Sequence, residues 1–328
     1  MPHNLITDVA GVRVGNADDA KLASGVTAIV FDRPAVASVD IRGGGPGTRE
    51  TALLDPAMTV DRIDGLALSG GSAFGLDAAS GVQAWMREQG RGYQVREAVV
   101  PIVPGAILFD LLNGGDKKWG RYPPYRELAY AAAASADVRF ALGSVGAGLG
   151  ATTYNLKGGL GSASAMHGGI TVGALAAVNA AGSVAVGDSA QFWAAPFEQG
   201  NEFGGRGFPQ HVSAQALVPH TKGAPAANTT LVIVATDAIL TKAQAKRLAI
   251  MAQDGIARSV YPVHTPLDGD VVFATATGVH PLTDPRLGFT QLGALAANVV
   301  ARAIARGVYE ASALPFAGAQ QSYRDKFP

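Results

Sequence analysis

The sequence predicts an α/β protein, and two observations carry this prediction. β-rich segments alternate with segments of helical periodicity along the 328 residues. In addition, 42 glycines and an aromatic content of only 7% favour layers that pack closely through small side chains. The chain is long enough for a full core, and its length alone allows one large domain or two smaller ones.

The part of the chain before residue 192 contains predicted strands and helices. Strands are predicted at 11–15, 25–31, 66–68, 171–179 and 183–186, the last two paired with each other. Helices are predicted at 73–89, where Ser72 is the expected N-cap, and at the alanine-rich segment 124–136. A glycine-dense stretch, 143–161, lies between the predicted helix at 124–136 and the predicted strand at 171–179.

A long segment without periodicity divides the chain. Residues 192–228 are rich in Pro, Gly, Gln and Asn, which predicts an exposed linker. Regular structure then resumes with predicted strands at 229–237 and 271–275, a helix capped by Thr241 that runs to about 260, and a final helix at 290–310. Structureless segments of this length are usually functional or disordered.

Composition excludes several classes of function. Basic and acidic residues both number 26, so no net positive field attracts nucleic acid or an anionic membrane. No apolar run reaches the roughly 18 residues of a membrane span. The absence of cysteine excludes disulfides, thiolate metal sites and a cysteine nucleophile. Because Met1 to Asn4 lead into a polar stretch without a signal core, we expect a soluble cytoplasmic protein without metal or cofactor.

Two glycine-rich segments lack familiar catalytic patterns. The segment Arg42 to Thr51 must be a loop, but it lacks the Lys-Ser/Thr ending of a phosphate-binding loop. The segment Ser69 to Leu76 lacks the Gly-x-Ser-x-Gly order of a nucleophile elbow.

Thr229 is the strongest candidate for a nucleophile, because the linker ends there and a buried strand begins. A backbone cut before Thr229 would remove no core packing. It would also give Thr229 a free α-amine, whose ordinary pKa near 8 suits a general base at neutral pH. One residue then supplies both the attacking hydroxyl and the base.

Each of these signals also has a plainer interpretation. By themselves, Asn228, Thr229 and Thr230 favour an ordinary strand start or a chance glycosylation sequon, and the sequon interpretation fails without a secretory signal. Asp268 and Asp270 flank a glycine and either orient the threonine or form a turn or a cation-binding loop, although the calcium-loop pattern is absent. Asn179 ends a strand and either donates its amide to an oxyanion or closes a turn.

Taken together, these motifs resemble the self-processing family of L-aminopeptidase/D-amidase-esterases, β-peptidyl aminopeptidases and nylon-oligomer hydrolases. The segments that carry the resemblance are Arg42 to Thr51, Ser69 to Leu76, Gly146-Ala147-Gly148, Asn228-Thr229-Thr230 and Asp268-Gly269-Asp270. The resemblance implies a four-layer αββα sandwich like that of N-terminal-nucleophile hydrolases. It also implies that one hydrolase domain, 1–328, is cleaved into an α subunit, 1–228, and a β subunit, 229–328.

The resemblance extends to single residues. Thr229, Asp268 and Asp270 are similar to the nylon-oligomer hydrolase branch, and Asn179 matches the oxyanion-stabilising asparagine of the family. Two positions depart from that branch, because Phe109 stands where its tyrosine is expected and Asn155 stands where its lysine is expected. Lys157, two residues further along, is then the candidate catalytic lysine, and Phe109 and Asn155 are candidate substrate-binding residues.

We therefore expect an autoproteolytic N-terminal-threonine hydrolase, either an aminopeptidase or an endo-type 6-aminohexanoate-oligomer hydrolase. Its partners would be a small peptide or amide substrate and copies of itself, because the resemblance implies a homo-oligomer, a tetramer or larger, of αβ units. Two alternatives are an acyltransferase of the ornithine acetyltransferase type and a small-molecule binding protein without turnover.

Overall fold

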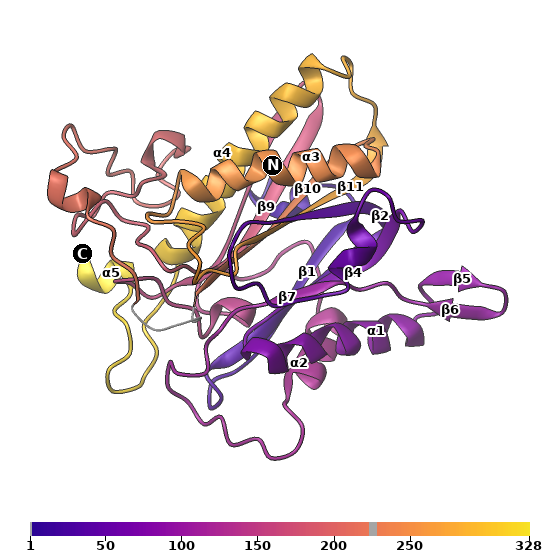
Figure 1. Cartoon of the computed structure of the whole chain (residues 1–328), viewed down its shortest axis with the longest axis horizontal. Coiled ribbons are helices and arrows are strands. Elements are labelled where there is room, and N and C mark those ends of the chain that lie inside the picture. The colour runs from indigo at the N-terminus through magenta and orange to yellow at the C-terminus, as the bar shows by residue number, and fades with distance from the viewer. Residues whose placement is uncertain (1, 223–227) are drawn as a thin grey trace.

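The structure, a computed structural model, describes residues 2–222 and 228–328. Strands and helices alternate as an α/β protein requires (Figure 1). The helices are α1 (Ala78–Glu88), α2 (Tyr125–Ala134), α3 (Lys242–Ala257), α4 (Leu287–Tyr309) and α5 (Tyr323–Lys326). Short 3₁₀ helices, η1 to η6, lie at Ile6–Asp8, Thr51–Leu54, Ser72–Asp77, Gly146–Gly148, Ala195–Phe197 and Ala214–Leu217.

The strands form one large sheet and one small hairpin. They are β1 (Val12–Asp19), β2 (Ser24–Ile41), β3 (Thr48–Arg49), β4 (Arg62–Ser69), β5 (Tyr93–Val95), β6 (Ala98–Val100), β7 (Gly105–Ile107), β8 (Gly159–His167), β9 (Ile170–Asn179), β10 (Thr229–Ala238) and β11 (Val271–His280). The 9-stranded sheet has the order β3-β7-β4-β2-β11-β10-β9-β8, and β1 pairs with β2. The hairpin β5-β6 projects from the body of the protein (Figure 1).

Three separate hydrophobic cores show that this sheet is folded into two layers. One core lies between α3, α4 and the β8 to β11 part of the sheet. A second core contains residues of β1, β2, β4, β9, β10 and β11, and it lies between the two parts of the sheet. A third lies between α1, α2 and the β1, β2 and β4 part. The layers are therefore α, β, β and α, with α3 and α4 above and α1 and α2 below in Figure 1.

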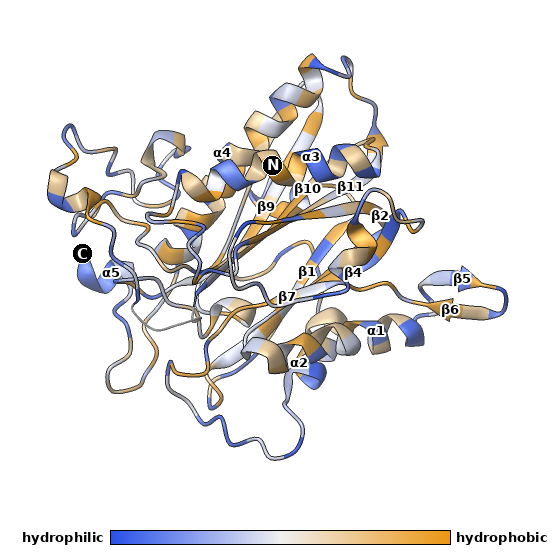
Figure 2. Ribbon diagram, in the orientation of Figure 1, coloured by the Kyte–Doolittle hydropathy of each residue, from blue (hydrophilic) through white to orange (hydrophobic). Residues whose placement is uncertain are grey.

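The long strand β2 joins the two sheet layers. Its first half directs Ile29 and Phe31 into the middle core, and Val30 into the core beneath α1 and α2. After a shift in its pairing with β4, its second half pairs with β11, and Val36 enters the core beneath α3 and α4. The alternation of side chains in a strand lets β2 serve all three cores, and its buried runs are among the orange segments of Figure 2.

Two local predictions were wrong. Ser72 does not cap a helix, because the N-cap of η3 is Gly71, in the left-handed conformation that glycine adopts most easily, and no side-chain cap is formed. Residues 183–186 are not a strand paired with 171–179 and form only isolated bridges with Tyr261 and Phe192. Instead β9 pairs with β8, which begins with Gly159 and Gly161, and glycine weakens a strand pattern.

The elements after residue 228 follow their predicted pattern, but the linker is not exposed throughout, because Phe192, Ala194 and Phe203 are buried in the core that contains α3 and α4. Thr241 caps α3 and forms a capping box with Gln244, as its position predicted. Described residues 192–222 contain only the short helices η5 and η6, while 223–227 lie outside the described residues. Among the described helices, α4 alone has the length and apolar composition of a membrane span, and 56% of that window is buried in the protein. Its packing against α3, β8 and β9 explains this apolar character.

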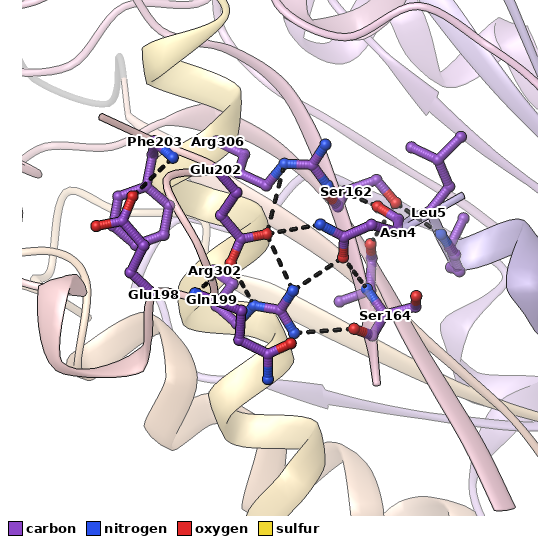
Figure 3. A network of polar contacts seen from close by, with 12 residues as sticks. Asn4, Leu5, Ser162, Ser164, Glu198, Gln199, Glu202, Phe203, Arg302 and Arg306 are labelled. Carbon is purple, nitrogen blue, oxygen red and sulfur yellow. Dashed lines mark hydrogen bonds and ion pairs between the residues drawn. The ribbon is translucent and has the colours of Figure 1, made fainter. Parts of the chain in front are cut away.

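A buried polar network ties the two ends of the chain to the linker (Figure 3). Arg302 of α4 is 2% exposed and contacts Glu202, which is 7% exposed, through two hydrogen bonds of 2.5 and 2.9 Å. Arg302 also donates to Asn4 and to the carbonyl of Ser164, and Asn4 donates to Glu202 at 2.7 Å. Although burial opposes it, hydrogen bonds from Arg302 and Asn4 hold the pKa of Glu202 below its usual value.

Removing one partner of this network should be costly, because it leaves a charge buried without its counterion. We expect Glu202→Gln to lower the free energy of unfolding by about 3–5 kcal/mol in a denaturant titration at pH 7. The difference should shrink as the pH falls below 4.5, the ordinary value, through the lowered pKa of Glu202. The control is Glu310→Gln, which breaks the exposed pair with Arg324 and should cost less than about 1 kcal/mol. Equal losses would contradict the prediction.

Candidate active site

Thr229 is the first residue of β10, which lies inside the sheet between β9 and β11. Its partner across the antiparallel pair with β9 is Asn179. Both residues are buried, with exposures of 4% for Thr229 and 1% for Asn179. Two of the predicted site residues, far apart in sequence, are therefore neighbours.

The loop before β11 meets the chain at Asn228. Asn228 and Asp268 form an isolated parallel bridge, and the Gly269 N–H donates to the Asn228 carbonyl oxygen at 2.9 Å. The Thr229 hydroxyl donates to the same oxygen. A Cβ at Gly269 would lie 2.6 Å from the Thr229 hydroxyl oxygen, so the close approach requires glycine. Two hydrogen-bond donors thus converge on the carbonyl of the Asn228–Thr229 peptide bond.

The backbone of the glycine-rich loop 42–51 is hydrogen-bonded to the loop before β11. The Arg42 N–H donates to the Asp270 carbonyl at 3.0 Å, and the Gly45 N–H donates to the Asp268 carbonyl at 2.7 Å. A Cβ at Gly43 would lie 2.3 Å from the Asp270 nitrogen. The loop therefore acts as a close-packed backbone support, a role that its composition did not reveal.

Among the described residues, neither aspartate side chain is hydrogen-bonded to the Thr229 hydroxyl, and only that of Asp270 contacts the backbone next to Thr229. Asp270 accepts from the Thr230 N–H at 2.8 Å and lies 2.8 Å from Nδ1 of His264. Asp268 accepts from the N–H and hydroxyl of Thr265 and from the N–H of Ala181. Burial, together with the charge of Asp270, raises the pKa of Asp268. Asp270 therefore links the start of β10 to the loop before β11, whereas Asp268 links that loop to the segment that follows β9.

The hydrogen bonds of the Asn179 side chain define the orientation of its amide group. Its Oδ1 accepts from the Thr152 N–H at 3.0 Å and from Nζ of Lys222 at 3.2 Å. Its Nδ2 donates to the carbonyl of Phe109 at 3.1 Å. These contacts fix which end of the amide donates, as an oxyanion donor requires.

Lys157, the candidate catalytic lysine, is buried and bound to carbonyl groups. Its Nζ donates to the carbonyls of Gly148, Ala151 and Gly158 at 2.8 to 3.0 Å. These three bonds equal the donor capacity of an ammonium group. Burial lowers its pKa to about 7, although the charge of Asp110 opposes this. No hydrogen bond joins Lys157 to Thr229 or Asn179 in the described part of the chain.

Lys222 is a residue of this site that the sequence did not single out. Its Nζ contacts the carbonyl of Thr152 at 2.8 Å, the carbonyl of Asn179 at 3.2 Å and both of their side-chain oxygens. Burial lowers its pKa to about 7, opposed by the charge of Asp268. Because Lys222 lies in a linker without periodicity, no sequence pattern marked it.

Two cavities flank the segment that contains Tyr154. A cavity of about 620 Å³ is lined by Phe109, Thr152 and Lys222, all of which hydrogen-bond to Asn179. We call it the Phe109 cavity. A second cavity of about 540 Å³ is lined by Asn155 together with aromatic side chains such as Trp193. The structure therefore brings Phe109 to the site, whereas Asn155 belongs to the neighbouring cavity.

Comparison with known proteins decides the family. The sequence profile described as Peptidase family S58 matches residues 4–321, nearly the whole chain. The chain belongs to peptidase family S58. This membership confirms the resemblance found in the sequence motifs and makes the protein a hydrolase of amide bonds.

Sequence relatives of this S58 peptidase include aminopeptidases and oligomer hydrolases. An uncharacterized aminopeptidase of Mycobacterium tuberculosis is 46% identical, over 99% of this chain and 98% of the relative. A 6-aminohexanoate-oligomer endohydrolase of a Kocuria species is 26% identical, over 89% of this chain and 82% of the relative.

Solved structures confirm the fold of the S58 peptidase. The L-aminopeptidase D-Ala-esterase/amidase of Ochrobactrum anthropi, described as a new variant of the Ntn-hydrolase fold, matches with a TM-score of 0.71. The match has 22% identity and covers 98% of this chain and 92% of that structure. A Burkholderia β-aminopeptidase also has a TM-score of 0.71, with 23% identity and coverage of 99% and 93%.

The contact between Gly269 and Thr229 is open to a direct test. Gly269→Ala should lower the free energy of unfolding by about 1–3 kcal/mol, because the added methyl group overlaps the threonine hydroxyl. The matched control is Gly45→Ala, whose Cβ would meet nothing closer than 3.6 Å. That change should stay within about 0.5 kcal/mol in the same denaturant titration. A Gly269→Ala protein as stable as the control would contradict the close approach.

Proposed function

We propose that this S58 peptidase cuts its own backbone between Asn228 and Thr229 and then hydrolyses amide substrates with Thr229. The observation that carries the proposal is the convergence of the Thr229 hydroxyl and the Gly269 N–H on the Asn228 carbonyl. The hydroxyl supplies the nucleophile, and the N–H supplies a donor for the oxyanion that forms when the carbonyl is attacked.

The self-cleavage step is an acyl shift followed by hydrolysis. The Thr229 hydroxyl oxygen attacks the Asn228 carbonyl carbon, the peptide C–N bond breaks, and the hydroxyl proton passes to the departing nitrogen. The resulting ester is then hydrolysed by water, which releases the Asn228 carboxylate and restores the hydroxyl. A donor such as the Gly269 N–H contributes about 3–4 kcal/mol to such a transition state.

The buried side chain of Asn228 favours the cut. The residue is 2% exposed, and neither its Oδ1 nor its Nδ2 has a hydrogen-bond partner among the described residues. Burying an unpaired polar group costs about 1–3 kcal/mol. Cleavage gives Asn228 a free end and lets these atoms reach water, so the uncut chain is the less favourable state at this point.

Cleavage also creates the catalytic base. Thr229 is 4% exposed in the uncut chain, so substrate has little access to its hydroxyl. After the cut, its α-amine accepts the hydroxyl proton while the oxygen attacks a substrate carbonyl, and the proton then passes to the leaving amine. Water hydrolyses the acyl-enzyme. The uncut chain is therefore an inactive precursor.

The other predicted residues act around Thr229. Asn179 donates its amide to the oxyanion of the substrate, and Asp268 and Asp270 orient Thr229 through the backbone of 228–230 and 268–270. Lys157 holds the carbonyls of the 148–158 turn and thereby shapes the segment that supports Asn179. Phe109 and Asn155 contact substrate from the two cavities.

The substrates proposed for this enzyme are small peptides or other linear amides. The names of its relatives, aminopeptidases and 6-aminohexanoate-oligomer endohydrolases, support this range. Assembly of the αβ units into a homo-oligomer and a cytoplasmic location stay predictions from the sequence.

Self-cleavage predicts a specific pair of fragments. Wild-type protein analysed by denaturing mass spectrometry should contain chains 1–228 and 229–328. Thr229→Ala should remain one uncut and inactive chain, whereas Thr229→Ser, which keeps a hydroxyl, should still be cut. A wild-type chain that stays intact after long incubation would overturn the proposal. The two fragments would also exclude a binding protein without chemistry.

The role of Asn179 predicts a separation of kinetic constants. Asn179→Ala, assayed on the fraction that is cut, should lower kcat on an amide substrate by about a hundred- to a thousandfold. Asn155→Ala is the comparison variant, and it should raise KM with little change in kcat, because Asn155 lines a cavity wall. An Asn179→Ala enzyme with kcat within tenfold of wild type would remove Asn179 from the oxyanion site.

A further inference from the structure

Asp110 is a buried acidic residue next to Phe109, and the mechanism described so far does not use it. Its side chain is held at both oxygens, because Oδ1 accepts from the Gly71 N–H at 2.7 Å and Oδ2 accepts from the Ser24 hydroxyl at 2.6 Å. Burial raises the pKa of Asp110, and the hydrogen bond from Ser24 and the charge of Lys117 oppose this. A carboxylate is costly to bury, so one that is held in a single orientation needs a reason.

Two segments of backbone approach the Asp110 carboxylate so closely that both need glycine. A Cβ at Gly70, in the turn between β4 and η3, would lie 2.1 Å from Oδ2 of Asp110. A Cβ at Gly150, in the segment after η4, would lie 2.5 Å from the same oxygen. The glycines of two segments that are far apart in the sequence thus make room for one side chain.

Phe109 lies between two residues that are bound to the turn between β4 and η3. The Leu108 N–H donates to the Ser69 carbonyl at 2.9 Å, and the Ser72 N–H donates to the Leu108 carbonyl at 3.0 Å. The side chain of Asp110 accepts from an N–H of the same turn. The backbone of Phe109 is therefore held from both sides, and the position of its carbonyl oxygen depends on Asp110.

The carbonyl of Phe109 binds one end of the Asn179 amide, and a second segment near Asp110 binds the other end. Nδ2 of Asn179 donates to Phe109 at 3.1 Å, and Oδ1 accepts from the Thr152 N–H at 3.0 Å. Lys157 donates to the carbonyl just before Thr152 at 2.8 Å. Burial lowers the pKa of Lys157 to about 7, and the charge of Asp110 opposes this, which favours the ammonium form with its three donors.

We propose that Asp110 is a positioning residue that aims the Asn179 amide at the oxyanion of the substrate. It acts through the carbonyl of Phe109 on one end of the amide and through the turn that contains Thr152 on the other. The inference rests on the proposed function. It also gives the segment Ser69 to Leu76 a role, because the turn at the start of this segment binds the Asp110 carboxylate.

The test variant is Asp110→Asn, which keeps the size of the side chain but removes its charge and one of its acceptor oxygens. On the cut enzyme it should lower kcat for an amide substrate by about ten- to a hundredfold and leave KM within about twofold, because a displaced oxyanion donor weakens only the transition state. Self-cleavage should proceed as in wild type, since its donor is the Gly269 N–H. The control Asp64→Asn changes another buried aspartate, which accepts from the Ile102 N–H, and should match wild type.

A double-mutant cycle tests whether Asp110 acts through Asn179. In an Asn179→Ala background, Asp110→Asn should lower kcat by less than about threefold, because the group that Asp110 positions is already gone. Losses that multiply would show that Asp110 acts independently of Asn179 and would overturn the inference. A rise in KM at unchanged kcat would overturn it too, because Asp110 would then be a substrate contact in the Phe109 cavity, which it also lines.

The remaining outcomes separate this inference from the proposed function. If Asp110→Asn does not fold, Ser24→Ala decides, since it removes one hydrogen bond and leaves the charge. It should lower kcat by about three- to tenfold at constant KM, and a kcat equal to that of wild type would overturn the inference. A folded Asp110→Asn chain that stays uncut would assign Asp110 to self-cleavage instead. An uncut wild-type chain overturns the proposed function and the role of Asp110 with it, whereas additive losses in a cut, active enzyme overturn only the role of Asp110.

Discussion

The hydrogen bond from the Gly269 N–H to the Asn228 carbonyl is the contact on which the rest of the site depends. It forms because the loop before β11 approaches β10 so closely that only glycine fits beside the Thr229 hydroxyl. Asp270 accepts a hydrogen bond from the Thr230 N–H, and backbone N–H groups of the loop 42–51 donate to the backbone carbonyls of both aspartates. A displacement in any of these supports would move the carbonyl away from its donors.

Because of the place of this bond in the fold, a cut before Thr229 would not require the strands to unfold. β10 is paired on both sides, by β9 and β11, so every backbone contact after Thr229 survives a cut before it. Packing of α3 and α4 over the same strands anchors the segment after Thr229 in the core. The buried pair of Arg302 and Glu202 adds a charged link between the segments before and after the proposed cut.

Several ionisable side chains are buried near the start of β10, and the described residues contain no cluster of His, Asp and Glu that could bind a metal there. Burial lowers the pKa of Lys157 and of Lys222 to about 7 and raises that of Asp268. Each group is nevertheless satisfied by backbone partners, which lets ionisable side chains remain in an apolar setting.

The sequence by itself determined the α/β class, the capped helix α3, the strand that begins at Thr229 and, through its motifs, the family. These features depend on local periodicity and on short-range capping, which neighbouring residues specify. Only the tertiary structure decided that Asn179 opposes Thr229, that loop 42–51 supports the aspartates and that Lys222 reaches Asn179. It also replaced the strand expected at 183–186 with β8. Such contacts join residues far apart in sequence, so no local pattern encodes them.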